Sequence, residues 1–280
     1  MASEPCYLLL DTLTMKHIWT NVELFWQGAV LSYRALFAWL NPATFLASMI
    51  IMPLGQIMFF TLLGIFATGA QNASFFLIGN AMQITAASGI FGVTMAIGGE
   101  RWGGTLMYLF GAPANRLAVF TGRAAIHILN GMFEVLMGLA WGWLLGWVDF
   151  SHTDPFALGL TILIATFSTA AFGLLLGCFG LLTLNIMLVN NFVYFLLLLF
   201  SGANVPISAL PSWMQYISWM LPLTRGIAAA REIVGGANLA QVAGLLAGEF
   251  LVGAVYLTAG YLLFRFFEIE AKRRGTLEAF

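Results

Sequence analysis

Apolar stretches long enough to cross a membrane as helices dominate this chain. About 20 helical residues span the roughly 30 Å hydrocarbon core of a bilayer. With 61% hydrophobic and 8% charged residues over 280 positions, the composition is far from that of a soluble domain. We therefore expect an all-α polytopic membrane protein with one membrane domain and six spans, at residues 43–67, 74–97, 124–148, 156–182, 186–202 and 241–266.

A separate amphipathic helix is predicted before the first span. Lys16, Glu23 and Arg34 fall on one side of residues 16–40 at 100° per residue, whereas tryptophans and other apolar residues occupy the rest. Such a helix lies flat at the membrane interface. We expect a cytoplasmic N-terminus and interfacial helix in residues 1–41, the membrane domain in 42–267 and a cytoplasmic tail in 268–280.

The eleven lysines and arginines predict the orientation of the chain. If six spans are right, only Arg225 and Arg231 lie on one side of the membrane, and all the others lie on the opposite side. Cytoplasmic loops carry the excess of positive charge. Both termini and residues 98–123 are therefore expected in the cytoplasm.

Residues 98–123 interrupt the apolar runs with charges and glycine pairs. The segment is too polar to cross a membrane, yet Leu106 and Phe110 make it too apolar for a free loop. A short helix that begins near Glu100, ends before Pro113 and presses against a cytoplasmic partner fits this composition. The alternative is an amphipathic loop that only caps the bundle.

A second unusual segment, residues 200–231, lies on the predicted outer side. It is too apolar for an exposed loop and too short to span. We expect one or two short helices that enter the outer leaflet and return, because irregular backbone at that depth needs protein or water to satisfy it. The residues that mark this re-entrant segment are Pro206, Pro211, Trp213 and Pro222.

The order of motifs in these two segments resembles that of the ABC-2 type exporter permeases. The outer segment carries Ser201-Gly202, Pro206, Leu210-Pro211 with Trp213, Pro222-Leu223-Thr224 and Arg231. The cytoplasmic segment carries Glu100, Gly104-Thr105-Leu106, Pro113 and Gly122-Arg123, with Met107 where a glutamate is usual. The resemblance covers nearly the whole chain.

This resemblance implies a half-transporter that pairs with a second permease subunit, identical or different, and with two ABC ATP-binding subunits. The site expected to couple to the ATPase comprises Glu100, Arg101, Gly104, Thr105, Leu106 and Phe110. The only lysines, Lys16 and Lys272, lie in no Gly-rich phosphate-binding motif, so ATP and Mg are expected on the partner. We expect a non-enzymatic subunit without cofactor, metal or nucleic acid, surrounded by lipids of a prokaryotic cytoplasmic membrane.

Polar residues inside the spans are costly in hydrocarbon and must face protein, water or substrate. The resemblance favours the second and fifth spans as the wall of the substrate path, with the candidates Asn80, Gln83, Asn190 and Tyr194. The alternative is that such side chains pair between helices. That alternative is favoured for His127 and Glu134, which share a stripe on the third span.

Outward export of an amphipathic or lipidic substrate, such as a drug, a natural product or a lipid-linked saccharide, is the function that this resemblance implies. The alternative is a proton-coupled secondary transporter that uses Glu134 or Glu249, since intramembrane acids are the expected feature of such proteins. An intramembrane enzyme has the least support. The three histidines fall in separate segments, and no Gly-x-Ser-x-Gly or His-Glu-x-x-His motif occurs.

Overall fold

The computed structural model describes residues 19–34, 44, 46–102, 104, 108, 115–180 and 185–274. Residues 19–34 form a helix, which we call the N-terminal helix, and no strand occurs among the described residues. The elements that follow are η1 (Leu46–Ile51), α3 (Met52–Thr68), η2 (Ala70–Asn72), α4 (Ala73–Ala86), η3 (Ala87–Gly92), α5 (Val93–Trp102), α7 (Arg116–Leu144), α8 (Pro155–Gly180), α9 (Ile186–Phe200), η4 (Ile207–Ala209), α10 (Ser212–Met220), α11 (Thr224–Val234) and α12 (Leu239–Arg274).

The helices confirm an all-α protein whose segments are suited to a membrane. Four helical stretches are long and apolar enough to cross one, at Ala70–Gly99, Ala118–Leu144, Pro155–Phe179 and Leu239–Phe267. Two shorter apolar helices, α3 and α9, coincide with the predicted first and fifth spans. The count of six spans stays a prediction.

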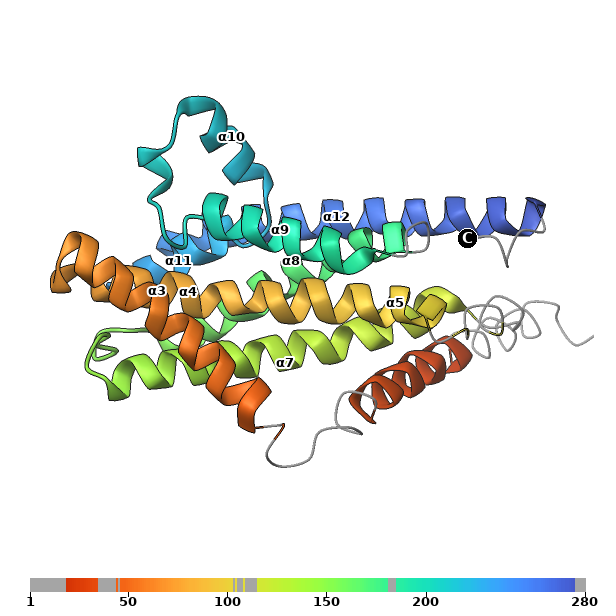
Figure 1. Ribbon diagram of the computed structural model, residues 1–280, viewed down its shortest axis with the longest axis horizontal. Coiled ribbons are helices and arrows are strands. Elements are labelled where there is room, and N and C mark those ends of the chain that lie inside the picture. The colour runs from red at the N-terminus through yellow and green to blue at the C-terminus, as the bar shows by residue number, and fades with distance from the viewer. Residues whose placement is uncertain are drawn as a thin grey trace, which may run out of the picture.

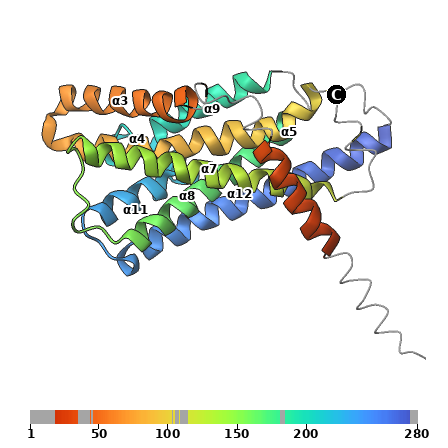
Figure 2. The ribbon, with the colours of Figure 1, turned by 90° about the horizontal axis from the view of Figure 1, so that it is seen from below.

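Figure 1 shows the long helices side by side along one axis, with the N-terminal helix at one end and α10 projecting from the flank. The second view shows α8 and α12 as neighbours that run in the same direction (Figure 2). Their rings meet at two levels, Phe167 with Phe250 and Phe172 with Tyr256. A buried core of small and branched side chains, including Ala81, fills the space between the helices.

The second span is not a regular α-helix. Its middle, η3, is a π-helical stretch between α4 and α5. Gly89 in η3 packs against α8 so closely that a side chain at Gly173 would overlap the Gly89 carbonyl oxygen. Such π-bulges inside α-helices frequently occur at functional sites. The bulge here brings Ser88 and Gly92 against α7, where Ser88 donates to the His127 carbonyl at 3.0 Å.

Candidate functional site

The outer segment folds back deep beside α12. Tyr256 donates its hydroxyl to the Met220 carbonyl, at the end of α10, over 2.9 Å. Tyr256 comes 17 residues after Leu239, the first residue of α12, which corresponds to about 26 Å along a helix. The turn between α10 and α11 therefore lies far from Leu239, where α12 begins. The segment thus turns back beside α12, and its entry into a bilayer stays a prediction.

Glu249 of α12 caps the start of α11 at that turn. Its carboxylate is fully buried and accepts three backbone N–H groups, from Leu223 at 2.6 Å, Arg225 at 3.1 Å and Gly226 at 3.2 Å. Leu223 adopts a left-handed conformation, with φ of 77°, that directs the chain into α11. A carboxylate is favourable at a helix N-terminus because the N–H groups there lack partners within the helix.

Arg231 of α11 donates to carbonyl groups of α4 and of the non-helical segment after α9. Its Nη1 donates to Gly202 and its Nη2 donates to Ala203, each at 2.9 Å. Nε and Nη2 both donate to the Phe75 carbonyl, at 3.2 and 2.9 Å, and the guanidinium carbon lies 3.5 Å from the centroid of the Phe75 ring. One side chain thus joins α4, α11 and the segment after α9.

The prolines and the tryptophan predicted to mark the outer segment lie at its corners. Pro206 precedes η4, Pro211 precedes α10, and Pro222 is buried in the turn before α11. Trp213 is exposed on α10. The segment therefore contains the short 3-10 helix η4 and two α-helices, of which α11 is buried against α4, α8 and α12.

Three of the four residues predicted to line the substrate path, Asn80, Gln83 and Asn190, are fully buried within the single chain. Each bonds to another residue of the chain. Asn80 donates to Asn204 at 2.8 Å, Ser201 donates to Gln83 at 3.1 Å, and Asn190 donates to Thr94 at 2.8 Å.

Tyr194, the fourth candidate, is partly exposed on α9. Its hydroxyl accepts a bond of 2.5 Å from Gln56 of α3, which is also partly exposed. The candidates therefore connect α3, α4 and α5 to α9 and the segment after it. Their part in a substrate path stays a prediction.

The stripe on α7 forms a second buried polar group. Asn130 donates to Ser88 at 3.1 Å and to Glu134 Oε1 at 2.8 Å. Glu134 Oε2 is buried and has no hydrogen-bond partner among the described residues. These bonds are of the structural kind favoured for Glu134 from the sequence, with Asn130 as its partner.

The cytoplasmic segment differs from the expectation at its ends. Glu100 and Arg101 lie in the last turn of α5, because that helix continues to Trp102 instead of a new helix starting at Glu100. Gly104 is exposed, with a φ of 65° that suits glycine. Thr105, Leu106 and Phe110 lie outside the described residues. α7 begins at Arg116, so the predicted loop is shorter than residues 98–123.

The N-terminal helix packs directly on the first turns of α7. A side chain at Gly28 would overlap the backbone of Val119, and one at Gly122 would overlap the Phe25 carbonyl. Asn115, the N-cap of α7, donates to Asn21 of the N-terminal helix at 3.1 Å. This contact joins the N-terminal helix to the chain just after the predicted coupling segment.

Several residues of this arrangement were not singled out from the sequence. Asn204 and Gln56 are hydrogen-bonded to candidates that lie far away in the sequence. Residue spacing along one helix predicts which side chains share a face, but it does not predict which residue of another helix they contact. Arg231 stood out only as part of a motif. Among the described residues, no group of three or more His, Cys, Asp and Glu side chains could hold a metal ion.

Comparison with known proteins decides the family. The sequence model of the ABC-2 type transporter family matches residues 27–234, well over half of the chain. The chain belongs to the ABC-2 type transporter family. As members of this family are membrane transport subunits, it is the membrane component of an ABC transporter, a class that works with ATP-binding subunits.

Two curated relatives match this ABC-2 permease, each described as a probable multidrug ABC transporter permease YbhR. One is from Escherichia coli strain K12 and the other from Escherichia coli O157:H7. Both are 26% identical over 199 residues, which cover 68% of this chain and 52% of the relative. The chain thus spans about half the length of the curated relatives it matches.

Proposed function

We propose that this ABC-2 permease exports an amphipathic or lipidic substrate, such as a drug, a natural product or a lipid-linked saccharide, outward across the cytoplasmic membrane of a prokaryote. Two separate ABC ATP-binding subunits hold ATP and Mg and supply the energy. The relatives' description as multidrug permeases supports this substrate class. The chain itself binds no cofactor in this proposal.

The observation that carries this function is the contact between the N-terminal helix and α7. Coupling requires that a movement of the predicted cytoplasmic segment is transmitted to the membrane-spanning helices. Because Gly122 of α7 packs directly on the Phe25 backbone, the N-terminal helix and α7 cannot move far relative to each other without repacking. A force at Glu100, Arg101, Gly104, Thr105, Leu106 and Phe110 then moves α5, α7 and the N-terminal helix together.

A second permease subunit is proposed to cover the exposed face of α9. Asn191 is exposed there and donates to the Met187 carbonyl of its own helix, and its neighbours Leu188, Phe192 and Phe195 are also exposed. An amide facing lipid leaves its carbonyl oxygen without a donor, which is costly in hydrocarbon. A partner helix that presents a donor removes this cost. The substrate path then lies between the two subunits, beside Asn80, Gln83, Asn190 and Tyr194.

A proton-coupled secondary transporter is the second candidate, and Glu134 is the observation that favours it. Glu134 Oε2 is buried without a partner among the described residues, so the bond from Asn130 to Oε1 is the one hydrogen bond seen there to stabilise the charge of the carboxylate. Glu249 is different, because three N–H groups already stabilise its charged form.

The two candidates make opposite predictions in sealed vesicles. The permease is purified with its cognate ATPase, reconstituted, and supplied with a fluorescent amphiphile. We expect accumulation that needs ATP and persists when an uncoupler collapses the proton gradient. Transport that follows the proton gradient without ATP would replace this proposal with the proton-coupled one.

A further inference from the structure

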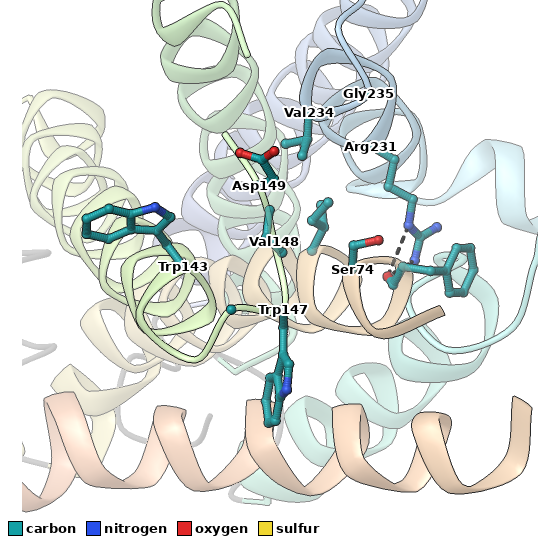
Figure 3. Close-up of a pocket in the computed structure, with 11 residues that line it drawn as sticks. Ser74, Trp143, Trp147, Val148, Asp149, Arg231, Val234 and Gly235 are labelled. Carbon is teal, nitrogen blue, oxygen red and sulfur yellow. Dashed lines mark hydrogen bonds between the residues drawn. The ribbon is translucent and has the colours of Figure 1, made fainter. Parts of the chain in front are cut away.

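A cavity of about 690 Å³ opens at the end of the bundle that holds the α4 start, the α7 end and the α11 end. By the proposed orientation this is the outer end. Its walls include Ser74 and Phe75 of α4, Trp143 of α7, Trp147 and Asp149 of the following loop, and Arg231 of α11 (Figure 3). The volume is within the range of about 300–1,000 Å³ that small-molecule sites occupy.

Two opposite charges lie in this cavity without pairing to each other. Asp149 is exposed, and its carboxylate accepts from the backbone N–H and the hydroxyl of Ser151, each at 2.9 Å. These bonds hold the pKa of Asp149 below its ordinary value, so the group is charged at neutral pH. A carboxylate has about four acceptor positions, so Asp149 keeps capacity for a ligand donor.

Arg231 provides the positive charge from the other wall. A guanidinium has five N–H donors, one on Nε and two on each Nη. The carbonyls of Phe75, Gly202 and Ala203 take the Nε donor, one from Nη1 and both from Nη2. Nη1 therefore keeps one N–H for a ligand oxygen. Figure 3 shows Arg231 and Asp149 on different walls of the cavity.

The tryptophans in the cavity wall indicate that the cavity lies at the boundary between lipid and water, where the headgroup of a membrane amphiphile is found. Trp143 is 61% exposed, and tryptophan is enriched at the boundary between lipid and water. Indole faces also attract an ammonium group. An amphiphile with one charge would leave one of the two protein charges unpaired, whereas a zwitterion pairs with both.

We propose that this cavity binds the headgroup of a zwitterionic amphiphile, with its phosphate or carboxylate at Arg231 and its ammonium at Asp149. Either a phosphatidylethanolamine molecule of the outer leaflet or an exported zwitterion has this chemistry. The proposal concerns binding by the permease alone and does not depend on ATP-driven export.

The test uses three probes with the same chain and different charges: dodecylphosphocholine, dodecyltrimethylammonium and dodecyl phosphate. Affinities for the full-length chain are measured below the micelle concentrations, in nanodiscs of phosphatidylglycerol. We expect dodecylphosphocholine to bind roughly tenfold more tightly than either single-charge probe, since its phosphate accepts from Arg231 while its trimethylammonium group, which has no N–H, is attracted to Asp149 by charge. Equal affinities for the three probes would overturn the proposal.

Variants locate the site. Asp149→Asn keeps an acceptor for Ser151 and should weaken dodecylphosphocholine roughly threefold or more, without weakening dodecyl phosphate. Trp143→Ala should weaken all three probes. Glu232→Gln, an exposed acid of α11 outside the cavity walls, is the control and should change none. Unchanged dodecylphosphocholine affinity in both Asp149→Asn and Trp143→Ala would exclude this cavity as the site.

The source of the ligand is distinguished by adding phosphatidylethanolamine to the nanodiscs. If this lipid lowers the apparent affinity for dodecylphosphocholine in the natural chain and not in Asp149→Asn, the occupant is a lipid. If the lipid does not compete while the probe still binds through Asp149, the occupant is a zwitterion that reaches the cavity from the path or from outside.

Discussion

Two charged side chains form hydrogen bonds to backbone groups of the outer segment that have no partner within a helix. Glu249 accepts from N–H groups at the start of α11, and Arg231 donates to carbonyl groups beside its other end. Neither depends on a counter-ion, because backbone dipoles surround each charge. Charges held by several hydrogen bonds favour one conformation, and removal of one of them leaves several backbone groups unsatisfied.

Glu249→Gln tests this role. Glutamine keeps one oxygen and turns an NH₂ group toward backbone N–H donors, so at least one donor loses its partner. The expected cost is about 1–3 kcal/mol of the free energy of unfolding for each orphaned N–H, seen as a lower melting temperature of the purified permease. Glu232→Gln is the matched control. A Glu249→Gln protein that melts normally but loses proton-dependent uptake would instead identify a proton site.

At the scale of elements, the N-terminal helix is held by close backbone contact rather than by a large apolar interface. Trp19 and Trp26 stay exposed, at 69% and 67%, and are free to reach lipid headgroups. The contact relies on Gly28 and Gly122, where a side chain would overlap the backbone of the other helix. A larger side chain at Gly122 of α7 should therefore displace the N-terminal helix.

Gly122→Leu is the corresponding experiment. Cysteines at positions 21 and 115, whose natural asparagines are hydrogen-bonded, should crosslink readily in a background without the natural cysteines. The leucine should push the N-terminal helix away and reduce crosslinking severalfold. Gly244→Leu, where a side chain meets nothing within 4 Å, is the control. Crosslinking that survives Gly122→Leu would contradict the packing described here.

The sequence predicts the helical elements much better than it predicts their connections. Long apolar runs give α7, α8 and α12 because a helix satisfies its own backbone in lipid, whatever its neighbours are. The π-bulge in η3 and the cap at Glu249 depend on contacts between helices far apart in sequence. The expected helix start at Glu100 was wrong because α5 extends through that residue. The glycine pair Gly98-Gly99 indicated a break in the helix that does not occur.

At the scale of the whole molecule, the account depends on which end faces the cytoplasm. Single cysteines in the same background at Ala114 and Asn238 test this. The one at Ala114 should be protected from an impermeant thiol reagent outside intact cells. The one at Asn238, which is exposed between α11 and α12, should label. Labelling of position 114 from outside would reverse the orientation and remove the coupling role of the cytoplasmic segment.

The central claim is that this permease receives its energy through the segment around Leu106 and Phe110. On the predicted coupling helix, at 100° per residue, positions 106 and 110 would lie about 40° apart, and Tyr108, which is 80% exposed, would lie about 200° from position 106. Aspartates at 106 and 110 would bury unpaired charge against the ATPase, and Tyr108→Asp is the matched control.

The deciding measurement is ATP-driven uptake by reconstituted vesicles, with retention of the ATPase scored in the same preparations. We predict that the double variant Leu106→Asp with Phe110→Asp loses both, while Tyr108→Asp keeps both. A double variant that holds its ATPase and transports at the natural rate would contradict the account.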